Sequence, residues 1–244
     1  ENAPAGGGGV RTVMGELRAA IEKVVQRAVE PVGAGRTDAG VHGWGQVVSL
    51  DLPDDQDLAE LERRINRLCG PDISVRDMTW ASTADFSARF SAQWRHYRYD
   101  VLEAPSGHPL MARTSWHVRG PLDLRAMQLA CDPLIGEHDF SSFCRRPKAV
   151  PGDPPASLVR RVLRADWREV PSDLVDGHGR LLRFEIRATA FCHQMVRSIV
   201  GTLVEVGTGS LRAGEVRGIL LQRDRQAAGK VAPPQGLTLW EVGY

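Results

Sequence analysis

The sequence predicts an α+β protein of two similar lobes, in which helices flank strands of a mixed or antiparallel sheet. Two observations support this fold class. Apolar residues recur at helical spacing in each half of the chain, and stretches of alternating apolar and polar residues between those helices mark strands. The composition of residues 103–109, rich in Ala, Pro, Ser and Gly, is typical of a linker. We therefore expect an N-terminal lobe, residues 1–102, and a C-terminal lobe, residues 103–244.

Two helices and three strands are predicted in the N-terminal lobe. Helical spacing of apolar residues predicts a helix over residues 12–28, and the alternation further on predicts a half-buried strand over 48–52. Asp57 has a side chain that caps helices well, and the apolar run after it ends at a Gly-Pro pair, so a second helix is expected there. Short strands are expected at residues 73–80 and 94–102.

The C-terminal lobe repeats this mixture of strands and helices. A polar and aromatic loop is expected at residues 136–143, followed by a basic stretch rich in proline. The other predicted elements are a strand over 114–118, a helix with Pro121 near its first turn that runs to residue 134, paired strands over 160–170 and 182–188, helices over 193–207 and 216–220, and a final strand over 237–244.

Composition excludes several classes of protein. With 42% hydrophobic residues and a net charge of +1, the chain can bury a core and is not coated in positive charge. The 31 basic residues include three lysines, so 28 are arginines, which suit contacts to phosphate and bases. Residues 144–168 hold seven basic and two acidic side chains. This run predicts a surface that follows RNA phosphates, although a solvated charged face is the commoner meaning of such a run.

The cysteines and the hydropathy pattern predict a reduced, soluble protein. The four cysteines never form C-x-x-C, so we expect structural thiols and neither a zinc ribbon nor a dithiol redox motif. Cys192 and His193 are adjacent and would point apart, so no metal is expected. No apolar run approaches the ~20 residues that cross a bilayer, and no signal peptide is visible, so a cytoplasmic location is expected.

Residues 35–42 form the most distinctive short segment, a predicted tight turn bracketed by glycines that holds Asp38 between Arg36 and His42. Glycine frees the backbone to bend, and the Thr and Asp side chains can hydrogen-bond the turn locally. A carboxylate presented on such a platform can react with a substrate, but in many turns of this kind the aspartate only caps the backbone. From this segment alone both interpretations stay open.

Five separated motifs resemble, in order, those of the TruA family of tRNA pseudouridine synthases. The family pattern contains A-G-R-T-D-A-G-V-H, a segment similar to F-H-A-R-F-S-A, R-x-Y-x-Y, a helix like H-x-M-V-R-x-I-V-G, and a terminal A-P-x-x-G-L. Agreement of this kind is not expected by chance. The matching segments are residues 34–42, 86–92, 95–99, 193–201 and 232–237.

The resemblance implies the pseudouridine synthase fold, with an active-site cleft between the lobes. It also implies an isomerase that converts uridine to pseudouridine in the tRNA anticodon stem-loop, at tRNA positions 38 to 40. The C1′–N1 bond breaks, the uracil turns, and C5 rejoins the ribose without redox change, so no cofactor and no metal are expected. The target base must be flipped out of its stem. Family members act as homodimers on tRNA, so we expect these partners and no membrane.

The resemblance also implies roles for three catalytic residues. Asp38 matches the nucleophile, and attack at the ribose C1′ or at the base C6 are both open routes. Arg197 matches the arginine that pairs with the nucleophile and keeps it ionised. Tyr97 matches the tyrosine that stacks on the uracil and helps to remove the C5 proton, whereas Tyr99, on the same strand face, is expected in the core.

Four further residues are expected to bind the substrate. Leu237 resembles the apolar residue that lines the other side of the base, and Arg36 would contact the RNA backbone or fill the space of the flipped base. Arg145 and Arg146 open the basic stretch that is our candidate for phosphate contacts. His42 is expected to be structural.

Two other functions and one departure from the family pattern complete the sequence hypothesis. A tRNA-binding or tRNA-folding protein without catalysis could use the same scaffold, but retention of all three catalytic matches favours the enzyme. A hydrolase with a carboxylate nucleophile would need a second acid or base, which no motif supplies. The family pattern has a strand with a Y-D-G-T-like segment before the first helix, and we expect this chain to lack it and to have an open sheet edge.

Overall fold

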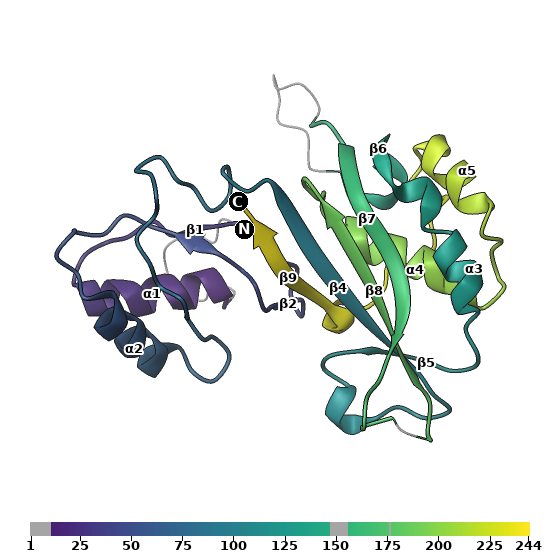
Figure 1. Ribbon diagram of the computed structural model, residues 1–244, viewed down its shortest axis with the longest axis horizontal. Helices are drawn as coiled ribbons and strands as arrows, with labels where there is room; N and C mark the ends of the chain where they lie inside the picture. Colours follow the sequence, from purple (N-terminus) through teal and green to yellow (C-terminus); the bar gives the residue numbers. More distant parts are fainter. Residues whose placement is uncertain (1–10, 147–155, 176) are drawn as a thin grey trace. The chain divides into compact units, whose positions relative to one another are not determined.

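A computed structural model describes residues 11–146, 156–175 and 177–244, and its α+β architecture has the mixed sheet that was predicted (Figure 1). The chain folds into two compact units. One contains the residues up to Gly35 together with Val47–Ser91, and the other contains Arg36–Gln46 together with Ala92–Tyr244. The turn around Asp38 therefore folds with the C-terminal residues. The lobe boundaries at 1–102 and 103–244 stay a prediction.

The first unit packs two helices against each other. They are α1 (Val13–Val25) and α2 (Leu58–Cys69), and their apolar stripes form one hydrophobic core. Strands β1 (Val32–Gly33) and β3 (Val48–Ser49) form a short antiparallel pair. The spacing of apolar residues thus predicted both helices to within a few residues.

Side-chain caps explain where these helices begin, and side chains of α2 explain why residues 73–80 form no strand. Thr12 and Asp57 accept hydrogen bonds from the first free N–H groups of the two helices. Asn66 in α2 exchanges two hydrogen bonds of 2.7 Å with the backbone of Val75. The expected strand at 73–80 is therefore wrong, because a helix side chain takes the backbone groups that a partner strand would need.

The second unit is built on a mixed sheet in the order β2-β9-β4-β8-β7-β6, with β5 parallel to β4. The pairs of β4 with β8 and of β8 with β7 are antiparallel, and the pairing of β7 with β8 was predicted. β2 and β9 are parallel, which joins the Asp38 segment to the end of the chain. The strands are β2 (His42–Gly43), β4 (Trp94–Glu103), β5 (Trp116–Val118), β6 (Gly136–Asp139), β7 (Val159–Val170), β8 (Arg180–Ala188) and β9 (Leu237–Gly243).

Three helices pack on one face of this sheet (Figure 1): α3 (Leu124–Leu129), α4 (Met195–Gly207) and α5 (Glu215–Gln222). The helix predicted with Pro121 near its first turn begins later, at Leu124 after the N-cap Asp123, and it also ends early. A 3-10 turn, Asp132–Leu134, replaces its last part because Pro133 lacks an N–H. In the described part of the chain, no helix is both long and apolar enough to cross a membrane.

The segment at 136–143 differs from the predicted loop. Gly136–Asp139 is strand β6, which pairs with β7, and Ser141–Phe143 forms a 3-10 turn. Phe140 and Phe143 are fully buried in the main core. Aromatic residues that looked like part of a polar loop are therefore core residues, and the polar side chains lie between them.

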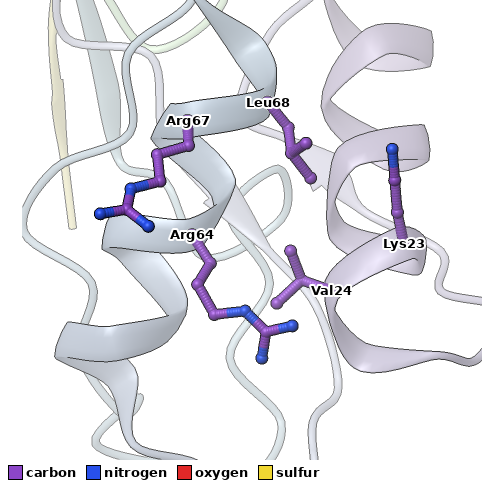
Figure 2. A pocket seen from close by; sticks show the side chains of 5 residues that line it. All are labelled: Lys23, Val24, Arg64, Arg67 and Leu68. Carbon is purple, nitrogen blue, oxygen red and sulfur yellow. The ribbon is translucent and has the colours of Figure 1, made fainter.

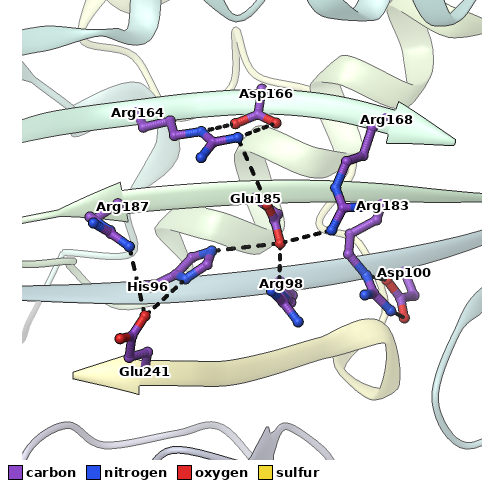
Figure 3. A network of polar contacts seen from close by, with 10 residues as sticks. All are labelled: His96, Arg98, Asp100, Arg164, Asp166, Arg168, Arg183, Glu185, Arg187 and Glu241. Atoms are coloured by element: carbon purple, nitrogen blue, oxygen red, sulfur yellow. Dashed lines mark hydrogen bonds and ion pairs between the residues drawn. The ribbon is translucent and has the colours of Figure 1, made fainter. Parts of the chain in front are cut away.

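The two faces of β4 differ as its alternation predicted. Tyr97, Tyr99 and Val101 face the helices and are buried. The other face carries a network of charged side chains, in which Glu185 lies 2.6 Å from Arg98 Nε (Figure 3). Burial raises the pKa of Glu185, but the charges of Arg98, Arg168 and His96 outweigh burial and lower it overall. The carboxylate therefore stays ionised although it is buried.

Candidate active site

The turn that carries Asp38 is fixed on both sides. Val41 N–H donates to the Asp38 carbonyl at 3.1 Å, and Gly40 has φ of +82°, a conformation that glycine adopts without strain. A Cβ on Gly40 would lie 3.0 Å from Pro234 Cγ, so the turn packs closely on the segment before β9. The predicted tight turn is therefore present, and its carboxylate is turned towards partners distant in sequence.

Arg197 in α4 is the first of these partners. Its Nη1 donates to Asp38 Oδ2 at 2.6 Å, and both side chains are largely buried, with exposed fractions of 14% and 23%. Arg197 Nε also donates to the Ala232 carbonyl at 2.8 Å, and Ala232 N–H donates back to the Arg197 carbonyl at 3.0 Å. The hydrogen bond to the Ala232 carbonyl thus fixes the guanidinium independently of its contact with the carboxylate.

Two glycines, Gly201 and Gly236, allow the segment before β9 to pack closely against α4 and Tyr99. A Cβ on Gly201 in α4 would overlap the Lys230 carbonyl. A Cβ on Gly236 would lie 2.7 Å from the ring of Tyr99, whose hydroxyl donates to the Pro233 carbonyl at 2.7 Å. Tyr99 is therefore a structural residue that supports the site, as expected.

A second partner, His193, was missing from the predicted site. Its Nε2 lies 3.1 Å from Asp38 Oδ1, on the other oxygen from the one that Arg197 contacts. His193 precedes Gln194, the N-cap of α4, and Arg197 lies in the first turn of that helix, so both side chains reach the carboxylate from the start of α4. The place of His193 in the same motif as Arg197, residues 193–201, was the signal that could have identified it.

Tyr97 and Leu237 lie on the neighbouring strands β4 and β9, and β9 also pairs with β2, just after Asp38. Tyr97 is buried and packs edge to face on Phe191, with ring centroids 5.0 Å apart. Burial, opposed by the charge of Arg95 and aided by that of Asp38, raises the pKa of Tyr97 to about 12. Tyr97 is therefore a neutral phenol near pH 7, suited to stacking on an uncharged base. Leu237 is 6% exposed and starts β9.

The predicted RNA-binding arginines are at the surface of the same unit. Arg36 is exposed, two residues before Asp38. The side chains of Arg145 and Arg146 are exposed as well, and Arg145 N–H donates to the His193 carbonyl at 2.9 Å. Residues 147–155 of the predicted basic run lie outside the described residues.

Further along the basic run, several arginines pair with acids. Arg164 binds Asp166 through two hydrogen bonds, and Arg168 contacts Glu185 at 3.4 Å. Counting seven basic against two acidic residues along the sequence missed Glu185, which the neighbouring strand supplies. These two arginines are therefore partly neutralised within the sheet.

The cysteines correct one expectation. Cys144 and Cys192 are joined by a disulfide across a sequence separation of 48, so they are not reduced thiols as predicted. Spacing along the sequence does not reveal a pair that only the fold brings together. Cys69 and Cys131 are free and buried, which fits structural thiols. In the residues that the structure describes, no group of three or more His, Cys, Asp or Glu side chains could hold a metal ion.

A shallow basic groove in the first unit contains none of the predicted site residues. It has a volume of about 260 Å³ and lies between α1 and α2 (Figure 2). It is lined by the cations Lys23, Arg64 and Arg67 and by the apolar residues Val24 and Leu68. The groove is a cationic surface of the first unit, and the Asp38 site belongs to the second.

Comparisons with known proteins show the class to which this chain belongs. The family model described as tRNA pseudouridine synthase matches residues 130–244. A tRNA pseudouridine synthase A from Brevibacillus brevis is 39% identical, over 96% of this chain and 90% of the relative. The protein of the same name from Leifsonia xyli is 42% identical, over 96% and 84%, and that from Gluconobacter oxydans is 38% identical, over 96% and 81%.

The class is thus the pseudouridine synthases, which are isomerases. Within it, this chain belongs to the TruA family of tRNA pseudouridine synthases. The predicted family, the α+β fold with a mixed sheet, and the isomerase class are confirmed.

Proposed function

We propose that this protein converts uridine to pseudouridine in the anticodon stem-loop of tRNA, at tRNA positions 38 to 40, with Asp38 as the nucleophile. The observation that carries the proposal is the pair of Asp38 with Arg197, at 2.6 Å between partly buried side chains. A guanidinium at this distance favours the ionised carboxylate, which is the reactive form. The names of the relatives, tRNA pseudouridine synthase A, support the same substrate class.

The reaction needs a nucleophile, a binding site for the base and a path for one proton. Asp38 attacks the ribose C1′ or the base C6, and the bond from C1′ to N1 breaks. After the uracil turns, C5 bonds to C1′, the C5 proton leaves, and N1 takes up a proton. The product therefore keeps every carbon, nitrogen and oxygen atom of the uridine, the C5 proton goes to solvent while N1 takes a proton from solvent, and the carboxylate is regenerated.

The second unit supplies side chains for holding the uracil. Tyr97 offers an aromatic ring that remains uncharged at neutral pH, and Leu237 an apolar side chain on the neighbouring strand. Stacking and apolar contact can offset the few kcal/mol needed to flip a base from its stem. Arg36 would bind the RNA backbone or fill the vacated space, and Arg145 and Arg146 would contact phosphates.

A homodimer would present two sets of these arginines to one tRNA, and we include dimerisation in the proposal. It follows from family membership and not from a contact within this chain. Sedimentation of the purified protein tests dimerisation. The chain has a mass of 26.8 kDa, and a species of twice that mass is expected at micromolar concentration.

The function is tested with two tRNA transcripts labelled with tritium at uridine C5. One has uridine at positions 38 to 40, and the other has cytidine at those positions. We expect tritium release from the first transcript and background release from the second. Release from both would contradict the proposed positions, and release from neither, with tight binding of both, would indicate a protein that binds tRNA without modifying it.

A further inference from the structure

We propose that His193 is a positioning residue for the nucleophile, holding one oxygen of the Asp38 carboxylate while Arg197 holds the other. The inference rests on the proposed function of Asp38. No motif role was assigned to this imidazole, and it would act on the substrate only through Asp38. Its contact is specific: His193 Nε2 lies 3.1 Å from Asp38 Oδ1.

Two donors on separate oxygens restrict the carboxylate in a way that one donor cannot. Arg197 Nη1 alone, at 2.6 Å from Oδ2, would still allow the carboxylate to turn about its own bond. His193 Nε2 lies 3.1 Å from Oδ1, and in this proposal it donates its N–H there, which fixes the plane of the group and leaves further lone pairs on both oxygens for attack. Because small errors in the direction of attack slow a reaction strongly, this plane matters for the rate of the chemical step.

The backbone around His193 is built to hold it there. Gln194 has φ of +64°, an unfavourable conformation for a residue with a Cβ, and it directs the chain from His193 into α4. Met195 N–H closes this turn on the Cys192 carbonyl at 3.1 Å. The His193 carbonyl itself accepts from Arg145 N–H at 2.9 Å.

The disulfide adds a covalent restraint at the same place. It joins Cys192, the residue before His193, to Cys144, the residue before Arg145. Two adjacent residue pairs are thus tied together, one by a hydrogen bond and the other by a covalent bond. A surface histidine that met a carboxylate by chance would not need so many restraints, although half of the His193 side chain is exposed.

The test compares His193→Leu with His193→Gln, whose side-chain N–H can reach a similar position. We expect His193→Leu to lower kcat for tritium release by about tenfold to hundredfold, the range for removal of a hydrogen bond to a charged group. KM and the Kd for tRNA should stay within about twofold. His193→Gln should recover kcat to within about threefold of the wild type. His178→Leu, at an exposed histidine of the β7–β8 connection, is the matched control and should match the wild type.

A purely structural role for His193 would give a different pattern. His193→Leu and His193→Gln would then lose activity equally, with a lower melting temperature, and this would overturn the proposal. Unchanged kcat in His193→Leu would overturn it as well, since the contact would have no effect on the chemical step.

A readout without turnover separates this inference from the proposed function. In the wild type, the His193 imidazole N–H should give an NMR signal protected from exchange with water, and Asp38→Ala should abolish that protection. An unprotected signal in the wild type would contradict the contact. A protected signal in a protein that releases no tritium would contradict the proposed function and leave the contact in place.

Discussion

Arg197 donates to Asp38 at 2.6 Å across 159 residues of sequence, and the same guanidinium is anchored to the Ala232 carbonyl. The ion pair is therefore positioned by two segments that each contact Arg197 of α4, the turn that carries Asp38 and the segment that contains Ala232. Gly40 packs on Pro234 from one side, and the parallel pairing of β2 with β9 holds the turn from the other. The site is thus a product of long-range packing within the second unit.

Removing the guanidinium should stop catalysis more than it weakens binding. In Arg197→Met the carboxylate loses its charged partner in a partly buried site, so we expect kcat to fall by about 100-fold or more while the Kd for tRNA changes by less than about fivefold. Arg217→Met, at an exposed position of α5, is the control and should keep full activity. A Kd that rises as steeply as kcat falls would place Arg197 in tRNA binding instead.

Gly201 should be essential for packing. A Cβ there would meet the Lys230 carbonyl, so Gly201→Ala should reduce the free energy of unfolding by about 1–3 kcal/mol or more in urea titrations. Gly218→Ala offers a matched control, because Gly218 lies inside α5 with no neighbouring atom within 4 Å of the added Cβ. It should stabilise by about 0.5–1 kcal/mol. Equal effects of the two changes would show that the close approach is not required.

His96 should make folding stability depend on pH near neutrality. Burial lowers its pKa below the ordinary value of 6.5, with Glu185 opposing the shift. Below about pH 6.5, His96 is protonated in the unfolded chain but stays neutral in the folded protein. The free energy of unfolding therefore falls as the pH drops below 6.5. The contribution is at most about 1.4 kcal/mol per pH unit. Unfolding free energies of wild type and His96→Leu between pH 5 and 7.5 should show a shallower slope in the variant, and parallel slopes would contradict this assignment.

Arg145 and Arg146 should affect binding and its salt dependence. The double change to alanine keeps the Arg145 N–H that supports His193, so we expect a Kd for tRNA raised by about threefold to tenfold and an unchanged kcat at saturation. The slope of log Kd against log salt should fall by about one for each phosphate that the variant no longer neutralises. Arg64→Ala, in the groove of the first unit, serves as the comparison. A slope changed only by Arg64→Ala would move the phosphate contacts to that groove.

Periodicity predicted the elements that depend on their own burial pattern. The helices α1, α2, α4 and α5 and the long strands of the second unit lie within a few residues of their predicted positions, because each has one apolar face that a core covers. The strand at 73–80 and the loop at 136–139 were wrong because pairing depends on a partner distant in sequence. Asn66 took the backbone groups in one case, and β7 supplied a partner in the other.

The residues of the candidate site were predicted mainly from the family motifs, and the chemistry of single residues added little. The structure brings Asp38 and Arg197 together and sets Tyr97 close enough for the charge of Asp38 to act on its pKa. His193 was absent from the predicted site, because its contact with Asp38 depends on the turn at Gln194 that leads into α4. The disulfide could not be predicted, since only the folded chain brings its two cysteines together.

The most direct test of the account is tritium release from C5-labelled tRNA by the wild type and by Asp38→Asn, with the Kd for tRNA measured on both. Asparagine keeps the size of the side chain and removes the nucleophilic charge. We expect release by the wild type, no release by Asp38→Asn, and equal Kd values within about twofold. Equal release by both proteins would contradict it, because Asp38 would then not be the nucleophile.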